Sequence, residues 1–254
     1  CGQRSVTALV DISNYVMFEY GRPSHIFDLD KIDRELVVRW GKKGESLKLL
    51  NGNTVELDEQ VGVIADAKAV ESLAGIMGGE RSGIAVDTAD VFLEGAFFPP
   101  DVVAGVARRY GFVTDASQRF ERGVDPRGQE RAIERATQLL IEIAGGRPGP
   151  AVLTQDDAHQ PRRPGVTLRP ERVTSLLGVQ VPRTEIEDIL RRLGMQVAGA
   201  GDMLGVIPPS HRFDIAIEQD LIEEVARIHG YDNIPRIDAR MPQRPQPATE
   251  RAVT

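Results

Sequence analysis

The chain has 254 residues, of which 41% are hydrophobic and 27% are charged, and its formal net charge at pH 7 is −7. This composition is typical of a globular protein with one large or two ordinary domains, and its acidity argues against general binding of polyanions. No apolar run reaches the roughly 18 residues of a membrane helix, so no membrane partner is expected. The one cysteine excludes an internal disulfide and favours a cytoplasmic location.

The single cysteine is residue 1, and two interpretations of it remain open. It is either the lipid-bearing first residue of a processed bacterial lipoprotein or the start of a piece cut from a longer chain. No flexible polar tether follows it, because residues 5–12 already have the pattern of a strand. The missing tether favours the cut.

The next segment predicts a short helix over residues 11–18, which Gly21 ends. Residues 23–28 predict a compact turn that places His25 between apolar neighbours. Farther on, Asn51-Gly52 lies between alternating apolar residues and predicts a hairpin over residues 47–57. Other strands are expected at residues 35–40, 61–65, 70–74 and 91–94.

Two helices are expected in the following segment. Pro99-Pro100 opens a helix that continues to Tyr110, and residues 127–143 carry apolar side chains at helical spacing. Residues 145–165 are rich in Gly, Pro and polar side chains, which is typical of a domain junction. One strand is expected within it, at residues 151–154.

The last part of the chain predicts helices at residues 170–177 and 184–193, a small hairpin, and a final helix that ends at Gly230. Thr184 and Glu187 have the spacing of a capping box, and Asp214 is expected to cap the final helix. Helix, helix, hairpin and helix in this order resemble a winged-helix arrangement.

Two groups of charged residues have more than one interpretation. Six arginines, at 108, 109, 119, 122, 127 and 131, form either a solvated face or a phosphate-binding patch. Asp220, Glu223 and Glu224 share one helix face, with Asp214 shortly before them, and such carboxylates suit Mg²⁺. Alternatively, these acids only favour the helix dipole. The chain has no nucleophile elbow, phosphate loop, HExxH or CxxC.

Five separated motifs follow one another in the first part: DISNYVM at 11–17, GRPSHIFD at 21–28, GIMGG at 75–79, LEGAFF at 93–98 and TDASQRFERGVDP at 114–126. Two more lie in the second part: PSHRFD at 209–214 and DLIEEVARIHGYDNIP at 220–235. Together they resemble the β subunit of bacterial phenylalanyl-tRNA synthetase, over residues 2 to about 240.

The resemblance implies an α+β fold in three parts. A mixed-sheet editing domain would occupy residues 1–160, a small winged-helix-like α+β domain residues 161–240, and a linker or tail residues 241–254. Its implied function is hydrolytic editing of mischarged Tyr-tRNA(Phe), in support of phenylalanyl-tRNA aminoacylation in translation. Editing is needed because a pocket built for Phe rejects an added hydroxyl poorly, by ~100-fold. A second site can instead hold a buried polar group that binds this hydroxyl. Such a site accepts tyrosine and rejects phenylalanine, which would leave the polar group unpaired.

The resemblance also assigns roles to residues of this site. Glu94 would bind the para-hydroxyl of tyrosine, helped by the backbone of Gly78, while Thr114 and Ala116 would shape the pocket. His25 would line the site near the ester. The implied catalytic set is therefore His25, Glu94 and Thr114, with water as the attacking group and His25 orienting it or the terminal ribose.

Ser13 and Asn14 complete the implied substrate-binding residues. The family has Thr where this chain has Ser13, so the hydroxyl is kept. It more often has Gln and Met where this chain has Arg22 and Ser24, and these departures would alter how the tRNA end approaches.

The implied cofactors and partners belong to the whole enzyme. Mg²⁺, shared with the α subunit, would be held by Asp214, Asp220, Glu223 and Glu224, and ATP would be used only by the α₂β₂ enzyme with tRNA(Phe). Two rival hypotheses remain: a scaffold that holds the α subunit and tRNA without chemistry of its own, and a free-standing trans-editing deacylase.

Overall fold

The computed structural model describes residues 2–156, 158–199 and 201–236. The chain divides into two compact units, and each is described by itself. The first comprises Cys1–Arg163 with Ser210–Asp214, and the second comprises Pro164–Pro209 and the chain from Ile215 onward. The predicted tail at 241–254 lies outside the described residues.

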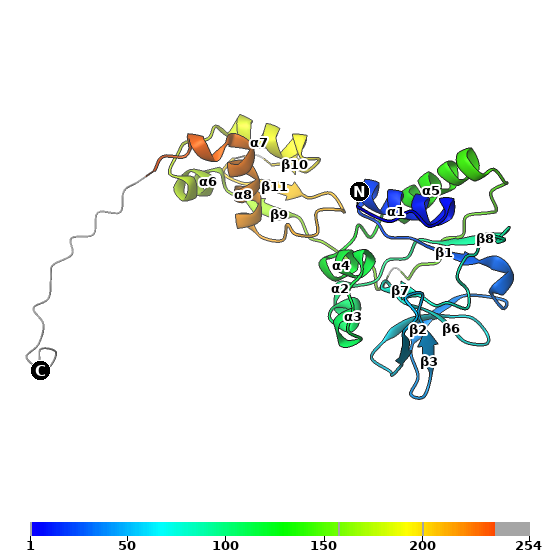
Figure 1. Ribbon diagram of the computed structural model, residues 1–254. Coiled ribbons are helices and arrows are strands. Elements are labelled where there is room, and N and C mark those ends of the chain that lie inside the picture. The colour runs from blue at the N-terminus through cyan, green and yellow to red at the C-terminus, as the bar shows by residue number, and fades with distance from the viewer. Residues whose placement is uncertain (1, 157, 200, 237–254) are drawn as a thin grey trace, which may run out of the picture. The chain divides into compact units, whose positions relative to one another are not determined.

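A pair of helices forms one layer of the first unit. Helices α1 (Ala8–Tyr20) and α5 (Gln129–Ala144) lie side by side (Figure 1). Apolar side chains spaced along one face of each helix are buried between them, and the buried set is Ile12, Val16, Ala132, Ala136 and Leu140.

The strand predicted over residues 5–12 is wrong. The Thr7 hydroxyl accepts a hydrogen bond from the Val10 amide at 3.3 Å, so it caps a helix that begins at Ala8. The helix continues until Gly21, whose φ of 65° ends it in a left-handed conformation. Local capping chemistry therefore overrides the strand preference of the apolar residues.

A two-stranded antiparallel ribbon accompanies these helices. Strand β1 (His25–Asp28) pairs with β8 (Val91–Glu94), so that His25 lies opposite Glu94. A 3₁₀ turn, Leu29–Lys31, follows β1. The strand at 91–94 was predicted, whereas residues 25–28 form a strand where a turn was expected.

An antiparallel sheet and a hairpin form the rest of the first unit. The sheet has the order β2-β5-β6-β7, with bounds Val37–Trp40, Gly62–Ala65, Val70–Leu73 and Met77–Gly78. The predicted hairpin is confirmed as β3 (Ser46–Lys48) and β4 (Thr54–Glu56). The α+β class is confirmed, with every described strand pair antiparallel rather than mixed.

Short helices close the core of this sheet. They are α2 (Pro100–Val103), α3 (Val106–Arg109) and α4 (Asp115–Arg122). The single helix predicted from Pro99 to Tyr110 is wrong, because Gly105 has a φ of 79° and interrupts it. Residues 151–154 also form no strand.

Gly75→Ala is expected to lower the free energy of unfolding by about 2–4 kcal/mol, as measured by urea denaturation. The φ of Gly75 is 71°, and an added Cβ would lie 2.9 Å from Phe98 and 3.0 Å from Phe120, so backbone strain and overpacking add. Gly52→Ala is the matched control, because its φ is 84° but nothing lies within 4 Å. Equal losses in the two variants would contradict the packing argument.

The second unit packs three helices with one small sheet. The helices are α6 (Pro170–Leu177), α7 (Arg183–Arg192) and α8 (Glu218–His229), followed by a 3₁₀ turn, Tyr231–Asn233. The predicted hairpin is confirmed as β10 (Gln196–Ala198) and β11 (Leu204–Ile207). A third strand that was not predicted, β9 (Val166–Leu168), pairs with β11.

Both helix caps predicted in this part of the chain are wrong. Helix α7 begins after Pro182 without a side-chain cap, and Glu187 instead binds Arg183 and Arg191, each at 2.8 Å. The start of α8 is capped by Asp220, which accepts from two backbone amides at 2.8 and 2.9 Å. Asp214 pairs with Arg212 at 2.7 Å. Nearby arginines and amides thus satisfy these carboxylates differently from the pattern in the sequence.

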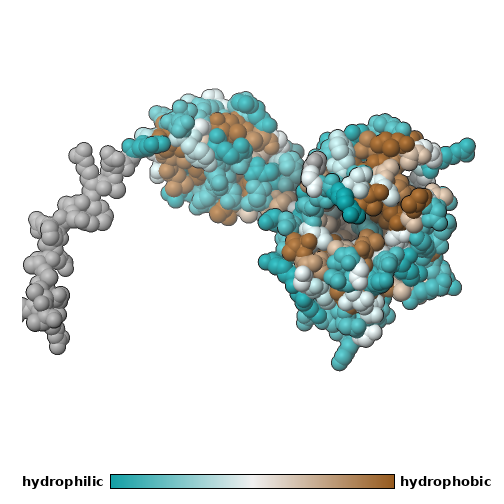
Figure 2. Space-filling model, in the orientation of Figure 1, coloured by the Kyte–Doolittle hydropathy of each residue, from teal (hydrophilic) through white to brown (hydrophobic). Residues whose placement is uncertain are grey.

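The visible surface of both units is mostly hydrophilic, with scattered apolar patches (Figure 2). Within the described residues, no helix is long and apolar enough to cross a membrane.

Candidate functional site

The ribbon of β1 and β8 brings two predicted site residues together. His25 and Glu94 are direct partners in the antiparallel register, and such partners project to the same face with Cβ atoms roughly 5 Å apart. They are 69 positions apart in sequence, from 94 − 25. Pairing of the strands therefore places His25 and Glu94 opposite each other, a neighbourhood that no local motif contains.

The Glu94 carboxyl group is partly buried and has one defined contact. Its Oε1 accepts a hydrogen bond from the Ala96 amide at 2.8 Å. Within the described residues, Oε2 has no hydrogen-bond partner. Burial raises the pKa of this carboxyl to about 7, against the opposing effects of the Ala96 amide and of Arg22. Near neutral pH the group is therefore divided between its acid and its carboxylate.

The His25 ring is enclosed by its neighbours. It packs edge-on against Phe27, with ring centroids 4.4 Å apart, and its buried Nε2 has no partner within the described part of the chain. Burial lowers the pKa of His25 to about 4. At neutral pH the imidazole is therefore uncharged, with a nitrogen available for a hydrogen bond.

Gly78 lies directly beneath this ring. A Cβ built on Gly78 would be 2.3 Å from His25 Cε1 and 2.5 Å from Nε2. Such distances are well inside van der Waals contact, so only glycine fits here without displacing the ring. The backbone of the glycine-rich turn therefore approaches the imidazole closely at Gly78.

Thr114 connects the same turn to helix α4. Its hydroxyl donates to the Ile76 carbonyl at 2.9 Å and accepts from the Ser117 amide at 2.9 Å, as the N-cap of α4. Ala116 lies in the first turn of that helix and is partly buried. Because the Thr114 proton is already donated, its contribution here is to position the turn.

Ser13 fixes the segment before His25. Its hydroxyl lies 3.0 Å from both the carbonyl and the hydroxyl oxygen of Ser24, which ties α1 to the start of β1. Asn14, the next residue of α1, is partly buried and makes no side-chain hydrogen bond within the described residues. Among the predicted residues, His25 thus neighbours Glu94 and Gly78, whereas Ser13 and Thr114 are linked to this group through Ser24 and Ile76. The roles assigned to all of them stay predictions.

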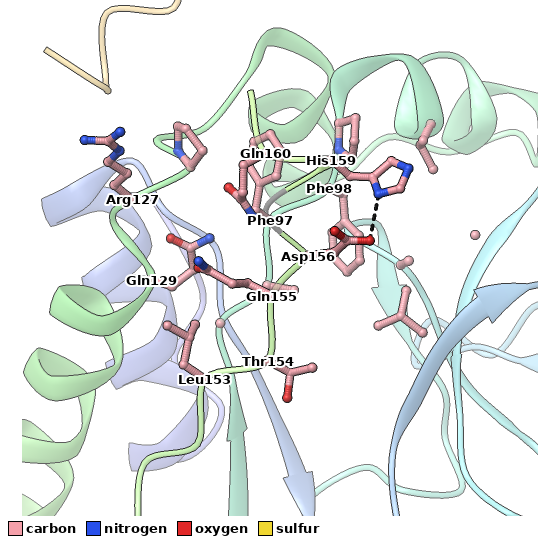
Figure 3. A pocket seen from close by; sticks show the side chains of 18 of the residues that line it. Phe97, Phe98, Arg127, Gln129, Leu153, Thr154, Gln155, Asp156, His159 and Gln160 are labelled. Atoms are coloured by element: carbon pink, nitrogen blue, oxygen red, sulfur yellow. Dashed lines mark hydrogen bonds and ion pairs between the residues drawn. The ribbon is translucent and has the colours of Figure 1, made fainter. Parts of the chain in front are cut away.

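A separate cavity of about 590 Å³ lies nearby, and none of the predicted site residues lines it. Its walls come from β2, β5 and the segments 95–99, 126–130, 153–156 and 159–160. Phe97 and Phe98 line this region, where His159 bonds Asp156 at 2.8 Å (Figure 3). Ala96 lines this cavity, and its backbone amide donates to Glu94. The 94–96 turn therefore adjoins both the cavity and the predicted site residues.

Three of the six arginines in the predicted basic group form ion pairs with acidic side chains. Arg108 pairs with Glu121 at 3.1 Å, Arg119 pairs with Asp115 at 2.9 Å, and Arg109 pairs with Asp58. These neutralising contacts favour the interpretation as a solvated face.

Three of the four acids predicted to bind Mg²⁺ have other contacts in this chain, and the fourth, Glu223, is exposed. Asp214 pairs with Arg212, Asp220 caps α8, and Glu224 is buried and pairs with Arg227 at 2.5 Å. No group of three or more His, Cys, Asp or Glu side chains in the described residues is placed to hold a metal ion. The Mg²⁺ assignment stays a prediction.

Comparison with known families matches this arrangement to a recognised domain. Residues 1–145, which include the whole β1–β8 ribbon and the glycine-rich turn, match the family described as B3/4 domain. The chain belongs to the B3/4 domain family. Residues 166–231 match the tRNA synthetase B5 domain, and most of them lie in the second compact unit.

Curated relatives are similar over most of this chain. The chain is similar to the "Phenylalanine--tRNA ligase beta subunit" of Burkholderia lata, at 58% identity over 92% of this chain and 29% of the relative. The protein of the same name from Bordetella pertussis is 52% identical, over 98% and 31%. The chain thus spans about 30% of these relatives' length. The resemblance predicted from the motifs is confirmed.

One solved structure is also similar. It is an N-terminal fragment of the phenylalanyl-tRNA synthetase β subunit from Pyrococcus horikoshii, with 16% identity and a TM-score of 0.40. The match covers 85% of this chain and 64% of that one.

His25 of the B3/4 domain, a partly buried residue, is expected to make stability fall with acid. Its pKa is about 4 when folded and 6.5 when unfolded, so the unfolded chain binds the extra proton between these values. Stability gained from this group is present above pH 6.5 and is lost as pH falls to 4, by at most about 3 kcal/mol. Urea denaturation of His25→Gln should show a flatter profile in that window.

Glu94 has the opposite effect on the pH dependence of stability, so its contribution must be removed from the comparison. Its folded pKa of about 7 exceeds the ordinary 4.5, so stability from its protonated form is lost as pH rises from 4.5 to 7. The profiles are therefore compared in a Glu94→Gln background. Identical slopes with and without His25 would show that the imidazole is not desolvated.

Proposed function

We propose that this chain is part of the β subunit of a cytoplasmic phenylalanine–tRNA ligase, and that its B3/4 domain hydrolyses mischarged Tyr-tRNA(Phe). The observation that carries the proposal is the pairing of Glu94 with His25 on adjacent strands, beside a glycine that leaves room for the imidazole. The similarity to ligase β subunits supports the substrate class.

Recognition of tyrosine is assigned to Glu94. Its Oε1 is held by the Ala96 amide, which leaves Oε2 to accept the phenolic hydroxyl. A bound phenylalanine would leave the desolvated carboxylate without that partner, and an unsatisfied buried charged group costs more than an ordinary hydrogen bond. The site therefore selects the amino acid that has the extra hydroxyl.

Hydrolysis is assigned to water. His25 is neutral at physiological pH because burial lowers its pKa to about 4, and its unpartnered Nε2 suits a hydrogen bond from the attacking water or the terminal ribose. Thr114 holds the glycine-rich turn in place through Ile76. Fixed positions of this kind supply much of the rate of an ester hydrolysis when no strong nucleophile is present.

The proposed partners are the α subunit, in an α₂β₂ enzyme, and tRNA(Phe). Charging of tRNA with ATP would belong to that whole enzyme, and Mg²⁺ would require ligands beyond the four acids of this chain. No step of the proposed hydrolysis uses the metal.

The test is deacylation of Tyr-tRNA(Phe) and Phe-tRNA(Phe), measured with this chain and with the complete enzyme. Release of tyrosine much faster than phenylalanine is the expected result. Bound tRNA without hydrolysis in the complete enzyme would support the scaffold hypothesis, and equal release of both amino acids would contradict selection at Glu94.

A further inference from the structure

Arg22 is a buried cation next to the proposed editing site. The residue is 1% exposed, although arginine is rarely buried without partners. Its Nη1 donates to the Asp125 carbonyl at 2.9 Å, and its Nη2 donates to the Ala96 carbonyl at 2.5 Å. Its Nε has no partner within the described residues. The guanidinium therefore ties the segment after β8 to the segment before α5.

The contact with Ala96 connects Arg22 to Glu94. The Ala96 carbonyl accepts from Arg22, while the Ala96 amide donates to Glu94 Oε1 at 2.8 Å. Ala96 is thus held from both sides, and its position sets the direction of the Glu94 carboxyl. A shift of Arg22 would move the hydrogen bond that orients Glu94.

Charge connects the two residues as well. Burial lowers the pKa of Arg22 to about 10, while the carboxylates of Glu94 and Asp125 oppose this effect. Conversely, Arg22 opposes the effect of burial on the pKa of Glu94. Within the described residues, the titratable group opposite Glu94 on β1 is His25, which is neutral near pH 7. Arg22 is therefore the cation that favours an ionised Glu94.

We propose that Arg22 is a positioning residue for tyrosine recognition: by holding the Ala96 carbonyl, it orients the 94–96 turn and with it the Glu94 carboxyl that meets the phenolic hydroxyl. The inference rests on the proposed editing function. It follows from the Arg22–Ala96–Glu94 contacts and the burial of the guanidinium. It also gives a role to a residue that the motifs marked only as a departure from the family's usual glutamine.

Two substitutions separate charge from hydrogen bonding. Arg22→Gln keeps a donor but loses the charge, whereas Arg22→Lys keeps the charge but loses the forked geometry. Arg191→Gln is the control for loss of a surface arginine, because Arg191 lies in the second unit and pairs with Glu187 at the surface. Each variant is made in the complete enzyme, and its melting temperature is recorded.

The main measurement is the pH dependence of kcat/KM for Tyr-tRNA(Phe) deacylation between pH 5.5 and 8.5, corrected for uncatalysed hydrolysis. The wild-type rate should rise with a midpoint near 7, the pKa of Glu94. In Arg22→Gln the midpoint should move up by about one pH unit, with a loss of about tenfold below it. Arg22→Lys should keep the midpoint near that of the wild type, as should Arg191→Gln.

The outcomes separate this inference from the proposed function. An unchanged midpoint in Arg22→Gln, with only a lower melting temperature, would overturn the role of Arg22 while editing stands. A wild type that does not release tyrosine would overturn the editing function itself. In that case, titration of the ¹³C-labelled Glu94 carboxyl in wild type and Arg22→Gln still decides whether Arg22 controls its ionisation.

Discussion

Replacing Glu94 by alanine is expected to abolish the preference for Tyr-tRNA(Phe) over Phe-tRNA(Phe). Selection by a buried polar group that needs a hydroxyl partner reaches ~10⁴ or more, and the variant lacks that group. The preference should fall close to unity, because phenylalanine no longer leaves a desolvated carboxylate unpaired. The measurement is the ratio of kcat/KM values for deacylation of the two substrates by the complete enzyme.

Glu94→Gln is the matched control for shape. It keeps the size of the side chain and an acceptor oxygen but removes the ionisable group, so a smaller preference that does not depend on pH is expected. Calorimetric binding of free tyrosine and phenylalanine to wild type and Glu94→Ala gives an independent measurement. Retention of the full preference for tyrosine in Glu94→Ala would exclude Glu94 as the group that recognises the hydroxyl.

Adding one methyl group at Gly78 is expected to lower Tyr-tRNA(Phe) deacylation by about 100-fold, because misplacing a reacting group by about 1 Å has an effect of this size. The new Cβ would lie 2.3 Å from His25 Cε1 and 2.5 Å from Nε2, so the ring must move. The backbone of Gly78 is not in the left-handed region, so the change acts through the ring rather than through backbone strain.

Two controls test this explanation. Gly149→Ala adds the same methyl group in the first unit, where nothing lies within 4 Å, and it should leave deacylation unchanged. The ¹H–¹⁵N spectrum of the His25 ring should shift in Gly78→Ala and stay constant in Gly149→Ala. A fully active Gly78→Ala with a displaced ring would show that the position of His25 does not matter for hydrolysis.

The sequence predicted the features that depend on neighbouring residues. Asn51-Gly52 identified its hairpin because the turn requires a left-handed conformation at Gly52, and the observed φ is 84°. The ordered motifs identified the family, and the strand that ends at Glu94 was predicted from its apolar run. The N-terminal strand failed because apolar and β-branched residues also fit a helix, and the cap at Thr7 decided between them.

Only the tertiary structure decided which distant groups meet. The register of β1 with β8 sets His25 opposite Glu94, and a shift by one residue would turn either side chain to the other face. Arg22 gave no sign in the sequence that it was buried, because its partners are the carbonyls of Ala96 and Asp125. Every residue has a backbone carbonyl, so the sequence does not show which carbonyls will bind a buried arginine. The amino-acid sequence therefore determined which side chains could form the site. The packing of the strands and turns determined what surrounds these side chains and whether they are charged.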